Sequence, residues 1–409
     1  MWKLPEPEVL PKSVSLAWDA RAMKHRDGVL RVIVTGGGTG GHVFPVVAAV
    51  RELRQRDVGS VDVLWIGAAD SLEARTAAGE GIAFAAVATG KLRRSSSLLG
   101  LFSAANVKDM IRVPLGVFQA RRLVRDFEPD VVLAAGGYVA VPVGLAAAWC
   151  GRRLVVHEQT VRIGLANRLL ARVAARVAVS SSSTVELLPR RVRSRTVVTG
   201  NPVRPEILAG EPDKAVSGLG LHGFDRCLPT VYVTGGAQGS VQINTLVAQI
   251  LPWLVDHANV LHQCGTANVD QIGDVAGALD LDAEPRYRAL GYIGPELPDV
   301  LALADVMVSR AGAGTIAEIT AAGKAAVLIP LASSAGNEQA HNARHLAEAG
   351  AAVALLGEVT ADRLREELHA LLSDDQVRVQ VAARAADLGR PDAASRLAVV
   401  VLEVAGRTG

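Results

Sequence analysis

Aromatic residues and cysteine are both scarce in this chain of 409 residues. Phe, Trp and Tyr together make up 4% of it, and the only cysteines are Cys150, Cys227 and Cys264. They lie far apart and form no CxxC pair, which argues against a disulfide framework or a cysteine-ligated zinc and favours a reducing cytoplasm. Half of the residues are hydrophobic and 40 are glycine, so disordered and collagen-like chains are excluded.

The sequence also lacks a secretory signal and an uninterrupted membrane span. Residues 1–28 are polar and contain proline, so we expect an N-terminal extension without an apolar signal core. Residues 131–151 carry no charge and are long enough to cross a bilayer. Gly136, Gly137 and Pro142 interrupt this run, which therefore predicts a buried strand, a turn and an Ala-rich helix.

Net charge is small but unevenly distributed. The formal charge is +2, yet residues 1–200 contain 28 Lys/Arg against 16 Asp/Glu, and residues 201–409 contain 15 against 25. A basic half favours an anionic surface or ligand, whereas ordinary composition drift between two solvated domains would give the same imbalance.

One pattern recurs along the chain: a short aliphatic run, a glycine-rich turn and then an amphipathic helix. The first instance is a strand at Leu30–Thr35, the turn GGGTGGH and a helix at Val43–Arg56. Alternating strands and helices indicate parallel sheets. We therefore expect an α/β protein of two doubly wound domains, 29–200 and 201–390, that meet near Gly200. Further strands are predicted at Val131–Ala135, Val231–Thr234, Asp305–Ser309 and Ala325–Pro330.

The first glycine turn carries a polar side chain at its mouth. Glycine turns after strands let backbone amides approach an anionic ligand at the start of the next helix. Gly36–Gly41 fits a dinucleotide-binding spacing only loosely, and no GK[ST] of a P-loop follows any of the turns. The next residue is His42, which favours chemistry at this turn; the simpler alternative is a hydrogen-bonding residue at the helix start.

Other polar residues follow predicted strands, at the edge where open α/β sheets bind ligands. His157–Gln159 follow the strand Leu154–Val156, and Asn201 follows the strand Thr196–Thr199. Both groups are therefore expected to face the same cleft.

The second half has a comparable polar set. Thr315 and Glu318 share one face of a helix's first turn, where Glu318 either accepts ribose hydroxyls or satisfies the helix dipole. A polar turn at 336–339 follows another strand. No metal site is expected, because no HExxH occurs and His341 and His345 fit a solvated helix face.

Taken together, these motifs resemble the MurG family, the undecaprenyl-diphospho-muramoylpentapeptide N-acetylglucosaminyltransferases of peptidoglycan synthesis. The resemblance implies a GT-B fold, in which two Rossmann-like domains face each other across a cleft. The last helix, expected at Ala393–Glu403 within 391–409, would pack back on the first domain. The motifs are GGGTGGHVFP (36–45), GGYVAVP (136–142), HEQ (157–159), GNPVRPEIL (200–208), TGGAQGS (234–240), SRAGAGTIAEITAAG (309–323) and NEQAHNA (337–343).

The resemblance further implies an inverting transfer of GlcNAc from UDP-GlcNAc to the 4-hydroxyl of the muramoyl sugar of lipid I. The products are lipid II and UDP, and no cofactor or metal is implied. His42 is the expected general base, because imidazole accepts protons near neutral pH. Glu158 and Asn201 are expected as orienting or alternative groups.

Site residues carry over from the family motifs. In the donor site Ile293 would read uracil through its backbone, Glu318 would bind ribose, and Gly312–Thr315 would hold the diphosphate. Glu338 and Gln339 would hold the GlcNAc hydroxyls. The acceptor set is Gly136, Gly137, Tyr138 and Gln159, with the turn at Thr39–Gly41 helping to hold the acceptor diphosphate. The full donor set is Thr39, Gly40, Gly41, Asn167, Arg204, Ala237, Gln238, Ile293, Gly312, Ala313, Gly314, Thr315, Glu318, Glu338 and Gln339.

Three residues depart from the family pattern. Thr160 stands where Asn is usual, with Asn167 as the expected compensating group. Ala237 replaces a common Ser and removes a hydroxyl contact to phosphate. Glu338 stands where Gln is frequent and adds a negative charge beside the sugar.

Residues 91–125 contain eight basic residues and one acid, Asp109, with Leu98, Leu99, Leu101 and Phe102 among them. Basic side chains around an apolar cluster suit reversible docking on anionic lipid. We therefore expect a peripheral protein on the cytoplasmic face of the membrane, with no nucleic-acid partner. The alternative is a core helix with solvated arginines.

Other functions remain open. The nearest is another UDP-sugar enzyme of the same fold, either a different lipid-directed glycosyltransferase or a UDP-GlcNAc 2-epimerase. A nicotinamide-dependent oxidoreductase is disfavoured because Asp62, the acid about 20 residues past the first turn, does not end a strand. A non-catalytic nucleotide-sugar-binding protein would leave the polar residues of the cleft dispensable.

Overall fold

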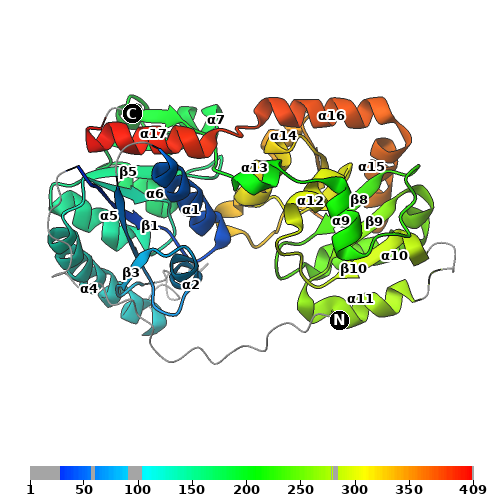
Figure 1. Ribbon diagram of the computed structural model, residues 1–409, viewed down its shortest axis with the longest axis horizontal. Helices are drawn as coiled ribbons and strands as arrows, with labels where there is room; N and C mark the ends of the chain where they lie inside the picture. Colours follow the sequence, from blue (N-terminus) through cyan, green and yellow to red (C-terminus); the bar gives the residue numbers. More distant parts are fainter. Residues whose placement is uncertain (1–27, 57–59, 91–103, 278, 280–283, 408–409) are drawn as a thin grey trace.

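Two parallel sheets organise the computed structural model, which describes residues 28–407 apart from 57–59, 91–103, 278 and 280–283 (Figure 1). The first sheet has the strand order β3-β2-β1-β4-β5-β6-β7, and the second β10-β9-β8-β11-β12-β13. Every strand pair is parallel. The strands of the first sheet are β1 (Leu30–Thr35), β2 (Val61–Gly67), β3 (Ala83–Ala86), β4 (Val131–Ala134), β5 (Arg153–Glu158), β6 (Arg176–Val179) and β7 (Thr196–Val198). Those of the second are β8 (Thr230–Thr234), β9 (Asn259–Gln263), β10 (Tyr287–Leu290), β11 (Val306–Ser309), β12 (Ala325–Leu328) and β13 (Val353–Ala354).

Helices cover both faces of each sheet, as doubly wound folds require. Around the first sheet they are α1 (Gly40–Gln55), α2 (Leu72–Gly79), α4 (Ala104–Phe127), α5 (Ala140–Trp149), α6 (Leu165–Leu170), α7 (Ser182–Glu186) and α8 (Arg190–Arg193). Around the second they are α9 (Pro212–Leu219), α10 (Val241–His257), α11 (Val269–Ala276), α12 (Leu297–Leu303), α13 (Ala313–Ala321), α14 (Glu338–Glu348), α15 (Ala361–Ser373) and α16 (Asp375–Leu388). Short 3₁₀ helices lie at Pro205–Leu208, Thr266–Asn268, Glu284–Arg286 and Ala335–Asn337.

Successive residues of β1 are buried on opposite sides of the first sheet. Val32 and Val34 pack among residues of α1, whereas Ile33 packs among residues of α4 and α5. Every residue of β1 is buried, including Arg31 and Thr35, which explains why its centre reads as the apolar run Val32–Val34 rather than as an alternating pattern.

The two domains are connected at two places. The chain leaves the first sheet after β7 and enters the second at β8, and α17 (Ala393–Ala405) then returns to the first domain. Leu397, Val401 and other apolar residues of α17 share the core cluster that contains α1 and β1. Figure 1 shows α17 lying along the first domain while α16 spans the second.

Several predicted element boundaries differ from the observed ones by one to three residues, and two of these differences matter for the site. The first helix begins at Gly40 rather than Val43, so His42 lies in the first helical turn instead of the preceding loop. His157 and Glu158 are the last residues of β5 rather than the first residues after it. The strand continues for two more residues because His157 and Glu158 pair with Ala178 and Val179 of β6.

Candidate functional site

A cleft of about 500 Å³ lies between the two domains. This size is typical of small-molecule sites, and the cleft is bordered by the first turn of α1, the loop after β5 and the loops of the second sheet. The expected residues that line it are Thr39, Gly40, Gly41, His42, Gln159, Arg204, Ala237, Ile293, Gly312, Ala313, Gly314, Thr315, Glu318, Glu338 and Gln339. Glu158, Asn167, Gln238 and the second glycine turn are not among its lining residues.

The ring of His42 is held in one tautomer. Its Nδ1 lies 2.9 Å from the Ala135 carbonyl oxygen and 3.1 Å from Gln159 Oε1. The Gln159 amide is oriented by its Nε2, which donates to the Ala135 carbonyl and so leaves Oε1 toward His42. Both partners of Nδ1 are therefore acceptors, and Nδ1 carries the proton. Nε2 is then the unprotonated nitrogen, which is the form that a general base requires.

A buried hydrogen-bond chain fixes this arrangement from behind. Gln159 Nε2 donates to the Ala135 carbonyl at 2.6 Å and contacts His157 Nδ1 at 3.1 Å. His157 Nε2 in turn lies 3.1 Å from the Gly200 carbonyl, so it is the protonated nitrogen of that ring. Burial lowers the pKa of His157 to about 4, and the nearby His42 acts in the same direction. His157 is therefore a neutral structural group that orients Gln159.

Glu158 organises the loop after β5 and does not line the cleft. Its carboxylate is buried and accepts from the backbone N–H of Thr160 at 3.0 Å and of Gly164 at 2.9 Å. It also accepts from the Thr160 hydroxyl at 2.7 Å and from Asn167 Nδ2 at 3.0 Å. Glu158 therefore supports Thr160, which lines the cleft, from behind. Asn167 is buried and does not line the cleft, so it does not take the place of the Asn that Thr160 replaces.

Asn201 also differs from its expected place. It lies beside a smaller cavity behind the main cleft. Its Nδ2 donates to the Ala313 carbonyl at 3.1 Å, and its Oδ1 is buried with no hydrogen-bond partner. Asn201 therefore holds the loop that leads into α13 from behind and does not face His42 across the cleft.

The first two glycine turns pack against each other. A Cβ at Gly137 would collide with the Gly37 backbone, and one at Gly38 would approach the Tyr138 ring at 3.1 Å. Gly136 and Gly137 both have positive φ, which L side chains rarely adopt. Gly136, Gly137 and Tyr138 do not line the cleft, although Gly137 and Tyr138 are partly exposed, and their acceptor role stays a prediction.

A buried carboxylate behind this turn has no counterpart in the sequence analysis. Glu73 of α2 is fully buried and accepts from the backbone N–H of Gly38 and of Ala68, each at 3.3 Å. A Cβ at Gly37 would collide with its carboxyl group. No motif marks Glu73, because it lies on a helix far from the turn in sequence.

The opposite wall presents an open helix start. Gly312 is the N-cap of α13 and has no side-chain cap, so the first amides of α13 face the cleft with the positive end of the helix dipole. Glu318 lies one turn further along the helix. Burial raises its pKa, and the charge of Arg204 opposes that change. The Arg204 guanidinium stacks 5.6 Å from the centroid of Phe44 in α1, so Arg204 contacts both walls.

Further residues complete the inner end of the cleft. The Ile293 N–H donates to Gln263 Oε1 at 3.1 Å, and Gln263 Nε2 donates to the Gly236 carbonyl at 2.9 Å. Gln263 thus connects the backbone of Ile293 to the third glycine turn. Tyr232, Thr234 and Tyr292 also line this end. The sequence analysis missed Gln263, although a polar residue at a strand's carboxyl end is a usable signal.

Near the start of α14, Gln339 accepts from the Leu331 N–H at 2.9 Å through Oε1. Asn337, just before α14, has a positive φ, which is uncommon outside glycine. Among the described residues no group of three His, Cys, Asp or Glu side chains is placed to hold a metal ion.

Two parallel α/β domains that enclose an uncapped helix start, a buried carboxylate and an oriented histidine are the arrangement of a GT-B enzyme. Comparisons with known proteins specify the family. Residues 32–179 match the glycosyltransferase family 28 N-terminal domain, and residues 230–397 match its C-terminal domain. The chain belongs to glycosyltransferase family 28.

Curated relatives in this family share one printed description, UDP-N-acetylglucosamine–N-acetylmuramyl-(pentapeptide) pyrophosphoryl-undecaprenol N-acetylglucosamine transferase. The protein of Salinibacter ruber is 38% identical over 382 residues, which cover 92% of this chain and 97% of the relative. That of Treponema denticola is 36% identical over 342 residues, covering 80% and 84%. The crystal structure of Acinetobacter baumannii MurG has a TM-score of 0.70 and 26% identity, covering 91% of this chain and 99% of that one. The expected family and GT-B fold are confirmed.

Proposed function

We propose that this protein transfers GlcNAc from UDP-GlcNAc to the 4-hydroxyl of the muramoyl sugar of a polyprenyl-pyrophosphoryl MurNAc-pentapeptide, with inversion at the anomeric carbon. The observation that carries the proposal is the pairing of His42 on one wall with the open start of α13 on the other. The identities of the donor and acceptor sugars are taken from the description that the relatives share. UDP is the leaving group.

The acceptor hydroxyl loses its proton to His42. As the 4-oxygen bonds to the anomeric carbon, its proton moves to Nε2, the nitrogen that the Ala135 and Gln159 contacts leave unprotonated. The ring is then a positively charged imidazolium whose Nδ1–H donates to the Ala135 carbonyl and to Gln159 Oε1. Hydrogen bonds to Nδ1–H stabilise that imidazolium, as an orienting carboxylate or carbonyl does in other histidine bases.

The bond from the anomeric carbon to the UDP oxygen breaks at the same time, and its electron pair leaves with the diphosphate. The amides of Gly312–Gly314 and the dipole of α13 stabilise that developing charge, because they are already oriented before it forms. Glu318 accepts hydrogen bonds from the ribose, and the backbone of Ile293 reads the uracil. For the Ile293 N–H to donate to uracil, its hydrogen bond to Gln263 Oε1 must break.

We also propose that the first domain docks on anionic lipid through a patch on α4 and α5. Leu115 is 50%, Phe118 59% and Trp149 55% exposed. The Phe118 and Trp149 rings meet edge to face at 5.5 Å, and the Arg121 guanidinium lies 4.8 Å from the Trp149 centroid. Arg112, Arg122 and Arg125 lie on the same helix as Phe118.

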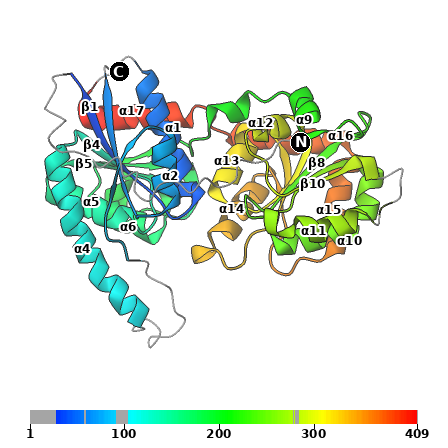
Figure 2. The ribbon, with the colours of Figure 1, turned by 60° about the horizontal axis from the view of Figure 1, so that its bottom comes forward.

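This patch differs in part from the segment expected for docking. Residues 91–103 of that segment, including Lys91, Arg93, Arg94 and the Leu98–Phe102 cluster, lie outside the described residues, as does the Lys108 side chain. Trp149 was not expected, because it is distant in sequence. Figures 1 and 2 show α4 on the side of the first domain away from the second. Among the described helices none is long and apolar enough to cross a membrane. The exposed aromatic and basic side chains of the α4–α5 patch support our proposal of a peripheral protein on the cytoplasmic leaflet.

The docking proposal is tested by vesicle sedimentation. The double variant F118S/W149S should bind vesicles containing anionic lipid several-fold more weakly than the wild type, because it loses interfacial aromatic groups. Val379→Ser removes another exposed apolar side chain from α16 and serves as the control. Equal binding by all three proteins would overturn the docking surface.

The reaction itself is tested by UDP release from UDP-GlcNAc with and without a lipid I analogue, with analysis of the sugar products. Acceptor-dependent release with formation of a disaccharide is the expected result. Release without acceptor, accompanied by N-acetylmannosamine, would instead identify a 2-epimerase. Binding of UDP-GlcNAc without release in either case would identify a non-catalytic binding protein.

A further inference from the structure

Helix α14 contacts both substrate-facing walls of the cleft. Its first residues, Glu338 and Gln339, line the cleft at the donor's sugar end. Further along the helix, His341 Nε2 accepts from Arg162 Nη1 at 2.8 Å, and His345 Nε2 lies 3.3 Å from Ser181 Oγ. Arg162 and Ser181 belong to the first domain. The helix therefore runs from the donor pocket to the acceptor domain.

Asn342 is the buried residue of this crossing, with 3% of its surface exposed. Its Nδ2 donates to the Ala311 carbonyl at 3.0 Å, in the loop that becomes the N-cap of α13. Its Oδ1 accepts from the Val161 N–H at 3.3 Å, next to Thr160 of the first domain. One side-chain amide thus joins the donor diphosphate loop to the loop that carries Gln159 and Thr160.

We propose that Asn342 is a positioning residue that sets the donor loop in register with the acceptor-side loop. The proposal rests on the proposed transfer reaction. An amide suits this position because it donates at one end and accepts at the other. An aspartate of the same shape would accept from Val161 but would place a carboxylate against the Ala311 carbonyl.

Asn201 holds the same loop from the side. It donates to the Ala313 carbonyl, two residues after the carbonyl that Asn342 holds. The loop is therefore anchored at Ala311 through α14 and at Ala313 through the interdomain connection. Loss of Asn342 leaves the Asn201 anchor in place, so the donor loop keeps its shape within the second domain. What changes is its register relative to His42.

The expected consequence is a separation of turnover from donor affinity. Asn342→Ala should lower kcat about 10- to 100-fold, since small misplacement of reacting groups has effects of this size. The KM for UDP-GlcNAc and the Kd for UDP should stay within about threefold of wild type, because the amides that bind diphosphate belong to the second domain alone. Asn342→Asp, which is isosteric, should lose at least as much turnover as Asn342→Ala.

The experiment measures acceptor-dependent UDP release, UDP affinity by calorimetry and thermal unfolding on the full chain. Arg344→Ala is the matched control, because Arg344 lies exposed on the same helix. Wild-type kcat in Asn342→Asp would overturn the proposal. A rise in UDP Kd that matches the fall in kcat/KM would also overturn it, by making Asn342 a donor-binding group. Absence of transfer by the wild type would instead refute the proposed function, before any variant is compared.

Discussion

The glycine loops of the two domains have similar sequences but different surroundings. In the first domain, a Cβ at Gly37 or Gly137 would collide with neighbouring groups. The second domain contains both kinds of glycine: a Cβ at Gly235 or Gly239 would collide with backbone atoms, whereas one at Gly236 or Gly314 would meet nothing within 4 Å. Close packing of the turn is thus common to both domains, and the difference is that Gly236 and Gly314 also leave open space at the cleft.

This difference changes how a glycine-rich turn should be interpreted. In the first domain the tight packing places the ring of His42 against the second turn: a Cβ at Gly136 would lie 3.2 Å from its Cε1. The buried Glu73 carboxylate takes the Gly38 N–H, so that amide is engaged within the protein. Gly37, Gly136 and Gly137 of the first domain therefore pack closely around an oriented side chain, whereas Gly236 and Gly314 of the second leave open space beside the cleft.

The largest expected effect comes from removing the oriented side chain. His42→Ala should lower kcat roughly 10³-fold, within the range for general bases, while the Kd for UDP stays unchanged. Initial rates of acceptor-dependent UDP release and a UDP titration measure the two quantities. Gln159→Leu, which removes one Nδ1 partner, should give a smaller loss. Full activity of His42→Ala would assign the base elsewhere.

Exchanging glycine for alanine in each domain tests the packing difference directly. Gly37→Ala should lower the free energy of unfolding by roughly 2–4 kcal/mol, because the added methyl group overlaps the buried Glu73 carboxyl. Gly314→Ala should not destabilise the protein, because its new methyl group meets open space in a helix, but it should raise the KM for UDP-GlcNAc. Denaturant unfolding and donor kinetics separate the two outcomes. Similar stability loss in both variants would show that the two loops are equally packed.

The fold could be predicted from the sequence because its signals are local. Buried parallel strands such as Leu30–Thr35 read as aliphatic runs, and the turns after them are rich in glycine. Helix α17 was placed by family resemblance, since its apolar face would fit either domain. The start of α1 was misplaced because Gly40 and Gly41 have poor helix propensity, which the surrounding structure overrides.

The site could be predicted only in part, because contacts between distant segments decide which polar residue reaches the cleft. Glu158 and Gln159 are neighbours in one motif, yet their side chains have different environments: Glu158 turns toward Gly164, and Gln159 toward Ala135. Glu73 lies in no motif, and Asn342 lies in the motif NEQAHNA without an assigned role, since each acts through backbone groups of loops far away in sequence.

Each domain also contains one buried histidine that should make stability depend on pH. Burial lowers the pKa of His157 in β5 and of His262 in β9 to about 4. His262 contacts Tyr287 Oη at 2.9 Å and Asn244 Oδ1 at 3.1 Å. The unfolded chain binds a proton at each histidine below about pH 6.5, whereas the folded chain does so only near pH 4. The unfolded state therefore binds more protons in this window, and stability falls as pH falls.

Between pH 7 and 5 each histidine should contribute a loss of roughly 2 kcal/mol. Urea unfolding at several pH values measures it. In His157→Gln and in His262→Gln the pH dependence should be shallower by that amount, whatever the offset at pH 7. A slope unchanged by one substitution but reduced by the other would show that only one domain uses its buried histidine in this way.

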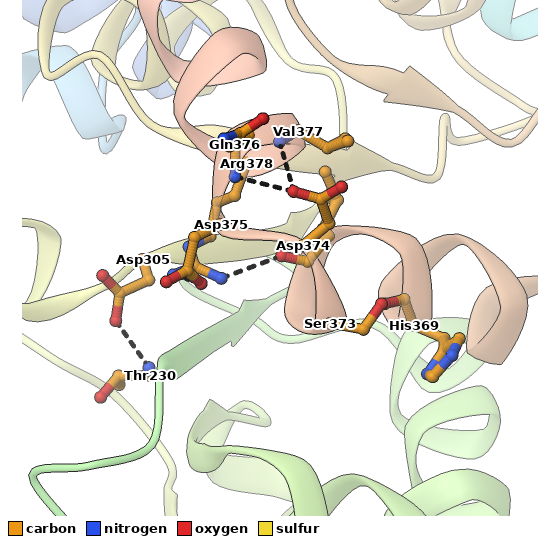
Figure 3. A network of polar contacts seen from close by, with 10 residues as sticks. Thr230, Asp305, His369, Ser373, Asp374, Asp375, Gln376, Val377 and Arg378 are labelled. Carbon is orange, nitrogen blue, oxygen red and sulfur yellow. Dashed lines mark hydrogen bonds and ion pairs between the residues drawn. The ribbon is translucent and has the colours of Figure 1, made fainter.

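The smallest expected effect concerns helix starts away from the cleft. Asp374 begins α16 and accepts from the N–H groups of Gln376 at 2.8 Å and Val377 at 3.2 Å (Figure 3). The helices that begin at the cleft, α1, α13 and α14, have no side-chain cap. The first amides of α13 are left for anionic oxygens, whereas the Gln339 N–H of α14 donates to Ser334 Oγ and those of α16 to Asp374.

Asp374→Ala should therefore cost about 1 kcal/mol of stability and leave transfer kinetics unchanged. Gly312→Asp, which places a capping carboxylate at the start of α13, should have the opposite pattern: stability kept or slightly raised, and donor KM increased many-fold because the carboxylate competes with the diphosphate for the same amides. Thermal unfolding and donor titration distinguish the two. Unimpaired donor binding in Gly312→Asp would show that the start of α13 does not hold the diphosphate, and the uncapped helix would then be a structural feature alone.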